Sequence, residues 1–222
     1  MKRIFVFDLD GTLTNTLPTI TYYVNFALRE VGLGHLGEIP PDRICRYVGD
    51  GAVLLCHRAL AHFGLDDPEH ADLYEAYWQA YNRAYDARPL YLTRPYEGMA
   101  ELIDALSRRQ IACAVLSNKP QTAVTAVVQH FFADRFAPVW GARPGIPLKP
   151  APDALLALLS EQGIDPRDAV MVGDTKVDIE TGRNAGVDTV GVLWGFRDRA
   201  ELVQAGATFI AQKPQDILRQ LL

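Results

Sequence analysis

The sequence predicts an α/β fold in which a parallel sheet is flanked by helices and a helical segment is inserted after the first strand. Two observations support this prediction. Short apolar runs alternate with helix-like patterns along most of the chain, and one long stretch near the N-terminus contains helix-like patterns alone. Strands and helices in alternation are typical of a parallel sheet with helices on both faces.

The predicted strands are four short apolar runs without polar alternation, which suits strands buried on both faces. They span residues 4–7, 111–116, 169–172 and 187–193. Polar residues follow three of them, namely Asp8, the pair Ser117 and Asn118, and Asp174 after Gly173. In Rossmann-like sheets of this kind, the ligand crevice lies at the carboxyl ends of the strands. We therefore expect these polar side chains at one edge of the sheet.

The segment after the first strand has helical spacing throughout, with Leu17, Ile20, Val24 and Leu28 as its first example. We expect residues 1–15 and 91–222 to form an α/β core and residues 16–90 to form a helical insert. Its aromatic residues, spaced along one helix-like pattern, are typical of packing rather than of a ligand site.

Composition narrows the classes of function. The chain has 222 residues and a net charge of −5, which argues against a broad nucleic-acid surface. No apolar run reaches the length of a membrane span or a secretory signal. Three scattered cysteines without metal spacing indicate reduced thiols, so we expect a cytoplasmic protein with no membrane or nucleic-acid partner.

Carboxylates gather at the expected strand ends. Asp8 and Asp10 follow the first strand, and Asp174 and Asp178 follow the third. Each alone is compatible with a turn, because Asp-Gly is a common turn signal. Four carboxylates at one edge would repel one another without a cation, and oxygen ligands of this kind suit Mg²⁺.

The same residues are suited to phosphoryl transfer. A carboxylate such as Asp8 can attack phosphorus to give an aspartyl-phosphate, provided that the negative charge of the phosphate is masked. Lys149 and a metal ion can do this electrostatically, and Ser117 and Asn118 offer a hydroxyl and an amide to the phosphoryl oxygens. Alone, a Ser-Asn pair at a strand end is usually a turn or a helix cap.

Four segments, in order, resemble the signatures of the haloacid dehalogenase superfamily. They are residues 8–13 (DLDGTL), Ser117, Lys149 and residues 173–178 (GDTKVD). An ordered set of four is much more specific than one DxDGT motif. Further segments resemble its phosphoglycolate phosphatase branch, namely residues 117–120 (SNKP), 148–153 (LKPAPD), 190–195 (VGVLWG) and 48–52 (VGDGA).

The resemblance implies specific roles. Asp8 is the nucleophile and a magnesium ligand, and Asp10 is the general acid and base whose backbone carbonyl also binds the metal. Asp174 is the third metal ligand, with Asp178 nearby through water, while Ser117 and Lys149 hold the phosphoryl group. The helical segment is then a mobile cap that limits water in the site.

The sequence departs from the family pattern at one position. The first signature of the family usually ends with Asp, where this chain has Asn15. We expect Asn15 to serve a cap or hinge hydrogen bond, with little effect on the chemistry.

Specificity is expected to come from the inserted segment, because the core residues contact only the phosphoryl group. Arg46 precedes a glycine-containing stretch at residues 47–51, where the resemblance places a specificity loop. Arginine grips a carboxylate through two hydrogen bonds, although a solvated arginine at a helix end is an equally good interpretation of this residue.

Several alternatives differ in how well the residues support them. The dehalogenases of the superfamily use no metal and lack the second Asp, so Asp10 and Asp174 both argue against a dehalogenase. A phosphonate hydrolase would need a cap lysine, which residues 16–90 do not contain. A sugar phosphomutase, a pyrophosphatase, a nucleotidase and a catalytically silent binding protein stay open, since a fold alone does not prove activity. We expect a magnesium-dependent phosphatase of a small phosphorylated metabolite, with 2-phosphoglycolate favoured by the resemblance, acting as a monomer or homodimer.

Overall fold

The chain forms two compact units in the computed structural model, which describes residues 2–221. The first unit joins the residues up to Asn15 with those from Arg94 onward, and the second unit is Thr16–Thr93. The second unit extends three residues further than the sequence predicted. The reason is that Thr19, on its first helix, donates a hydrogen bond to the carbonyl of Tyr91 at 2.6 Å and lies 2.9 Å, oxygen to oxygen, from Thr93.

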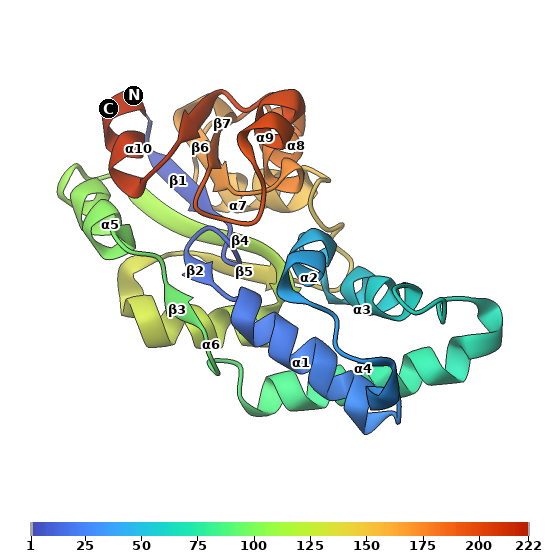
Figure 1. Cartoon of the computed structure of the whole chain (residues 1–222). Helices are drawn as coiled ribbons and strands as arrows, with labels where there is room; N and C mark the ends of the chain where they lie inside the picture. The colour runs from blue at the N-terminus through green and yellow to red at the C-terminus, as the bar shows by residue number, and fades with distance from the viewer. Residues whose placement is uncertain (1, 222) are drawn as a thin grey trace. The chain divides into compact units, whose positions relative to one another are not determined.

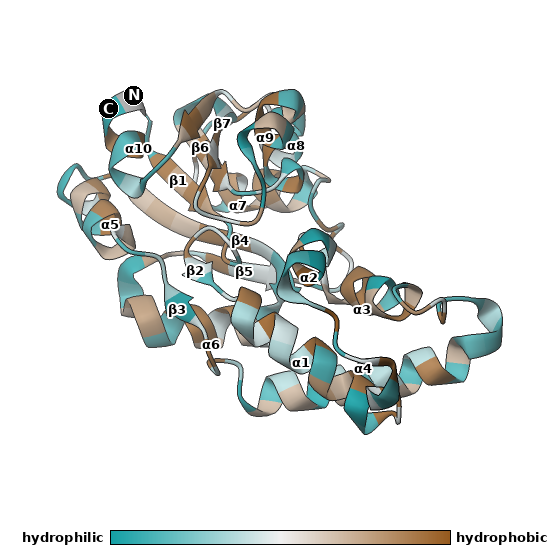
Figure 2. Ribbon diagram, in the orientation of Figure 1, coloured by the Kyte–Doolittle hydropathy of each residue, from teal (hydrophilic) through white to brown (hydrophobic). Residues whose placement is uncertain are grey.

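The first unit is built on a six-stranded parallel sheet in the order β5-β4-β1-β6-β7-β8. Its strands are β1 (Ile4–Phe7), β4 (Ala112–Pro120), β5 (Val139–Ala142), β6 (Ala169–Gly173), β7 (Asp188–Val192) and β8 (Phe209–Ala211). The α/β prediction is therefore confirmed, and β1 lies inside the sheet, as its apolar sequence predicts. Figure 2 shows β1 and β6 as hydrophobic strands.

The four predicted strands all form, and two more, β5 and β8, join the edges of the sheet. The sequence analysis missed both because they are short and have no long apolar run. The largest boundary error is at β4, which continues to Pro120, so Ser117 and Asn118 lie within the strand rather than after it.

Helices flank the sheet (Figure 1). They are α5 (Met99–Arg108), α6 (Gln121–Phe132), α7 (Asp153–Glu161), α8 (Lys176–Asn184), α9 (Arg199–Ala205) and α10 (Pro214–Leu221), with short 3₁₀ helices at Ala133–Arg135 and Pro166–Asp168. Because side chains alternate along a strand, Ile4 and Val6 pack into one apolar cluster with α7, while Phe7 points to the opposite face. There the ring of Phe7 meets Phe136 edge to face. Burial on both faces fixes the strand that ends at Asp8.

The second unit is helical, as predicted. Its helices are α1 (Leu17–Glu30), α2 (Pro41–Tyr47), α3 (Ala52–Ala61) and α4 (Ala71–Ala87), with 3₁₀ helices at Gly34–Leu36 and Pro68–His70. Tyr77 on α4 is fully buried, and its hydroxyl donates to the carbonyl of Val24 on α1 at 3.1 Å. This aromatic residue therefore packs in the core of the unit.

A small antiparallel pair of strands, β2 (Thr14–Asn15) and β3 (Arg94–Pro95), lies beside both points where the chain passes between the units. Asn15 pairs with Arg94 in this ladder. Its predicted hinge or cap hydrogen bond stays a prediction. Among the residues that the structure describes, no helix has both the length and the apolar character needed to cross a lipid bilayer.

Candidate active site

The candidate site lies at the carboxyl edge of the parallel sheet. Phe7 is in register with Val115 of β4 and Val172 of β6, so the residues that follow each strand arrive at the same edge. The backbone N–H of Asp8 still donates to the carbonyl of Val172 at 2.9 Å, which continues the pairing one residue beyond β1. Asp8 is therefore held by the sheet itself rather than by a flexible loop.

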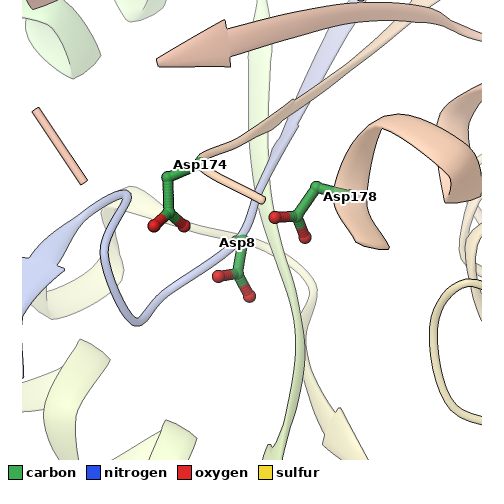
Figure 3. Close-up of side chains that lie close together, drawn as sticks. All are labelled: Asp8, Asp174 and Asp178. Atoms are coloured by element: carbon green, nitrogen blue, oxygen red, sulfur yellow. The ribbon is translucent and has the colours of Figure 1, made fainter. Parts of the chain in front are cut away.

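Three carboxylates meet at this edge. One side-chain oxygen from each of Asp8, Asp174 and Asp178 lies within 4.8 Å of the others, and all three residues are buried. Figure 3 shows the three side chains facing a common space, from the end of β1, the end of β6 and the first turn of α8. The sequence predicted this convergence from the strand ends for these three residues and also for Asp10, whose side chain is not part of this group.

One ammonium group lies among these carboxylates. Lys149 Nζ donates to Asp178 Oδ1 at 2.6 Å, to Asp8 Oδ1 at 2.8 Å and to the carbonyl of Leu116 at 3.1 Å. A lysine ammonium has three donors, so these contacts use all of them. Lys149 thus acts on the site through its charge and through the carboxylates that it holds.

Burial and charge shift the pKa values of these groups. Burial raises the pKa of Asp8 to about 7, against the opposing charge of Lys149, and Asp178 adds to the rise. Burial also raises the pKa of Asp174 well above its usual range, with further contributions from Asp178 and Asp8. Burial alone would lower the pKa of Lys149, but the charges of Asp178 and Asp8 outweigh it and keep that pKa above its usual range.

The charges at the site fit a divalent cation. Three ionised carboxylates and one ammonium leave two negative charges uncompensated, and repulsion among the carboxylates adds to the larger effect of burial on the pKa values of Asp8 and Asp174. The cluster could therefore hold a metal ion, with carboxylate oxygens of the kind that hard cations prefer.

Asp178 is oriented by the start of α8. Its Oδ2 accepts hydrogen bonds from the N–H of Thr175 at 3.1 Å and from the Thr175 hydroxyl at 2.9 Å, completing a capping box. This leaves Oδ1 directed to Lys149. A side chain at position 173 would overlap Asp178, so Gly173 lets the strand end approach the helix closely. The pattern Thr175-x-x-Asp178 is the sequence signal for this arrangement.

Asp174 is held from two sides. Its Oδ1 accepts from the Thr12 hydroxyl at 3.2 Å, and its Oδ2 accepts from the backbone N–H of Phe196 at 2.7 Å. Trp194 Nε1 donates to the carbonyl of Thr12 at 2.9 Å, which ties the loop after β7 to the loop after β1. A Cβ at Gly195 would overlap Asp174, so only glycine fits there.

Comparison with known proteins decides the family. Residues 5–192 match the family model described as haloacid dehalogenase-like hydrolase. The chain belongs to the haloacid dehalogenase-like hydrolases. A phosphoglycolate phosphatase of Rhodospirillum rubrum is 35% identical over 93% of this chain and 86% of its own length, and one from Vibrio vulnificus strain YJ016 is 32% identical over 99% and 94%.

The fold agrees with this membership. A solved structure from Lactobacillus delbrueckii subsp. bulgaricus superposes with a TM-score of 0.92 at 30% identity, covering 100% of this chain and 99% of the other. The family match and the relatives together make this chain a hydrolase of the phosphatase type.

Asn118 contacts the backbone of Lys149. Its side-chain Nδ2 donates to the carbonyl of Lys149 at 2.9 Å, and its Oδ1 accepts from the N–H of Lys149 at 2.8 Å. The sequence analysis assigned this amide to the phosphoryl oxygens. In the structure both ends of the amide contact the backbone of Lys149, and the predicted contact with the phosphoryl oxygens stays a prediction. Ser117 is buried on β4 beside it, and its proposed phosphoryl contact stays a prediction.

The side chain of Asp10 lies outside the carboxylate group that could hold the metal. Both of its oxygens accept hydrogen bonds from Lys119 Nζ, at 3.0 and 2.9 Å. The sequence analysis missed Lys119 although it lies inside the SNKP segment. A lysine near a strand end usually faces solvent, whereas here it is 9% exposed.

Arg46 is not among the residues that the α/β unit brings together. It belongs to the helical unit, where it is exposed in the last turn of α2. Its role in specificity stays a prediction.

Replacing Lys149 with methionine is expected to destabilise this hydrolase. The loss in the free energy of unfolding should be larger at about pH 8 than at about pH 5.5. The loss of the ammonium raises the pKa of Asp8 further, because Lys149 is the group that opposes the rise. A carboxyl group whose pKa is raised by folding stabilises the folded state while it is protonated, and that contribution is lost as pH rises through the folded pKa. Removing one partner of a buried ion pair costs about 3–5 kcal/mol, which urea unfolding with EDTA measures.

Lys213→Met is the matched control, because Lys213 is an exposed lysine of the same unit. It should change the free energy of unfolding by no more than about 0.5 kcal/mol at either pH. Equal losses for Lys149→Met at both pH values would contradict the electrostatic account.

Proposed function

We propose that the protein is a magnesium-dependent phosphatase that hydrolyses a small phosphorylated metabolite, 2-phosphoglycolate, through an aspartyl-phosphate on Asp8. The observation that carries the proposal is the placement of Asp8: a carboxylate fixed at the end of a buried strand, in contact with Lys149 and beside Asp174. Two relatives of at least 32% identity that carry the name phosphoglycolate phosphatase support the substrate.

In the first chemical step, a carboxylate oxygen of Asp8 attacks phosphorus and the bond to the leaving oxygen breaks. Asp8 is raised in pKa to about 7, so a substantial fraction is ionised near neutral pH even without a cation. The contact with Lys149 holds Oδ1 of Asp8 in one direction and leaves the other oxygen to attack. The product is a mixed anhydride between Asp8 and phosphate.

Asp10 acts as the general acid in the first step and as the general base in the second. It gives a proton to the leaving oxygen, so that the metabolite departs as an alcohol. It then takes a proton from a water molecule as that water attacks the phosphorus of the aspartyl-phosphate. Phosphate leaves and Asp8 is restored as a carboxylate. The two roles require a carboxylate that is distinct from the metal-binding group, as Asp10 is here.

The proposed magnesium ligands are the carboxylates of Asp8 and Asp174 and the backbone carbonyl of Asp10, with Asp178 next to them. When bound, the ion supplies the positive charge that masks the phosphoryl oxygens. Ser117 is proposed to donate to a phosphoryl oxygen, and Lys149 contributes its charge from behind Asp8.

Asp8→Asn is expected to abolish turnover while the fold survives. The amide has nearly the same shape but is a poor nucleophile, so the loss should amount to several orders of magnitude. Hydrolysis of p-nitrophenyl phosphate with MgCl₂ measures it, and circular dichroism checks the fold. Near wild-type activity in a cleanly purified variant would refute the covalent mechanism.

Magnesium is expected both to restore activity after EDTA treatment and to raise the melting temperature. Binding to the folded state alone stabilises it by about 2.7 kcal/mol at a hundred times the Kd. Asp174→Asn should lose most of this thermal shift, because it removes one carboxylate charge from the cluster. NaCl at matched ionic strength is the control. A wild-type protein whose melting temperature ignores magnesium would contradict the proposed metal site.

Arg46→Ala tests the proposed substrate. If Arg46 binds the carboxylate of 2-phosphoglycolate, its loss should raise KM for that substrate by about tenfold or more, since a charge-assisted pair contributes about 1.5–3 kcal/mol. p-Nitrophenyl phosphate has no carboxylate, so its KM should barely change. Arg43→Ala, an exposed arginine of the same helix, is the matched control. Equal losses on both substrates indicate a structural role, and no loss on either removes Arg46 from the site.

A further inference from the structure

The site contains a second buried ion pair that is separate from the Lys149 network. Lys119 Nζ contacts both carboxylate oxygens of Asp10, at 3.0 and 2.9 Å, and the two side chains are 7% and 13% exposed. Lys149 meanwhile contacts Asp8 and Asp178. The two lysines therefore contact different carboxylates, and Lys119 contacts the one that the proposed chemistry uses for proton transfer.

The backbone around Lys119 is built irregularly. Leu116 pairs with Trp140 and Pro120 pairs with Ala142, so β4 advances by four residues while β5 advances by two. The extra residues bulge from the ladder, and within the bulge the N–H of Lys119 donates to Ser117 Oγ at 3.4 Å. Ser117, Asn118 and Lys119 all lie in this buried, irregular stretch. In a regular strand, successive side chains would point to opposite faces of the sheet.

The neighbouring strand is shaped to accept this bulge. A side chain at position 141 would overlap the carbonyl of Lys119 and the Cα of Gln121, so only glycine allows the approach. Gln121 also links the two segments, because its Oε1 accepts a hydrogen bond from the N–H of Gly141 at 2.8 Å. The position of Lys119 is thus set by β5 as well as by its own strand.

We propose that Lys119 is the positioning residue for Asp10: it holds both carboxylate oxygens and so fixes the direction in which Asp10 meets the leaving oxygen of the substrate. This inference rests on the proposed function of Asp10 as general acid and base. Asp10 lies in the turn after β1, where the N–H of Gly11 donates to the carbonyl of Thr14. The turn fixes the backbone of Asp10, and Lys119 fixes its side chain.

Such a role predicts a particular pattern among substrates. The phenolate of phenyl phosphate is a basic leaving group that needs a proton as its bond to phosphorus breaks. The nitrophenolate of p-nitrophenyl phosphate is much less basic and can leave without one. Loss of a positioned general acid should therefore slow the first substrate far more than the second, whereas general damage to the site would slow both alike.

The test compares kcat/KM on these two aryl phosphates, because kcat/KM reports the steps up to formation of the aspartyl-phosphate. Lys119→Met should lower kcat/KM for phenyl phosphate by about 10²-fold, at the low end of general acid catalysis, and for p-nitrophenyl phosphate by no more than about fivefold. Lys119→Arg, which keeps a cation able to contact both oxygens, should restore most of the loss. Lys213→Met, at an exposed lysine, should leave both substrates unchanged.

A double-mutant cycle identifies the residue through which Lys119 acts. In an Asp10→Asn background, Lys119→Met should cause little further loss, because the group that it positions is already absent. The magnesium-induced shift in melting temperature should also be unchanged in Lys119→Met. If Lys119→Met does not fold, Lys119→Gln provides the same comparison. Equal loss on both substrates, or losses that add to those of Asp10→Asn, would overturn the inference.

Failure of the proposed function is recognised separately. A wild-type protein that hydrolyses neither substrate, or an Asp8→Asn variant that keeps its activity, would refute the phosphatase mechanism itself. An active wild type, an inactive Asp8→Asn variant and a Lys119→Met variant without leaving-group dependence would refute only the role of Lys119.

Discussion

The contact of the Lys149 ammonium with buried carboxylates is the interaction on which the rest of the site depends. Without it, Asp8, Asp174 and Asp178 would place three like charges at one edge of the sheet with no cation between them. Each partner of the ammonium comes from a different element: β1 presents Asp8, the first turn of α8 presents Asp178, and β4 presents the carbonyl of Leu116. Residues from β1, from β4 and from the start of α8 therefore all contact the ammonium of Lys149, which lies in the loop before α7.

The two buried lysines of the site have different roles. Lys149 sets the electrostatic field around the nucleophile, and its backbone is held in turn by the side-chain amide of Asn118. Lys119 contacts both carboxylate oxygens of Asp10, and the bulge in β4 places it there. One irregular stretch of β4 thus supplies the group that supports Lys149 and the lysine that contacts Asp10. Charge stabilisation and proton transfer share a scaffold but not their contacts.

The sequence predicted what depends on local pattern. Asp8 and Asp174 follow apolar runs that become parallel strands, so their meeting at one edge follows from the topology. The sequence analysis missed contacts between residues that are distant in the chain. It gave no sign that both ends of the Asn118 amide contact the backbone of Lys149, which lies 31 positions away.

The same limit applies to Lys119 and to the end of the helical unit. From the sequence alone, a lysine such as Lys119 is expected at the surface. The bulge that buries it depends on Gly141, which belongs to another strand, so the local sequence does not reveal it. Residues 91–93 join the helical unit through hydrogen bonds to Thr19, more than 70 positions away, which no local pattern reveals. The role of Arg46 depends on chemistry outside the chain, which no pattern of residues contains.

The order of the sheet also constrains how the chain can fold. Ile4 of β1 pairs with Ala112 on one side and with Ala169 on the other, so the strand that ends at Asp8 precedes both of its partners in the chain by long intervals. Closing such loops is slow compared with forming local helices. During synthesis, the apolar β1 segment must therefore stay uncovered while the helical unit, whose contacts are nearer in sequence, can already fold. The strand on which the chemistry depends is thus also an apolar segment that can associate wrongly in the nascent chain.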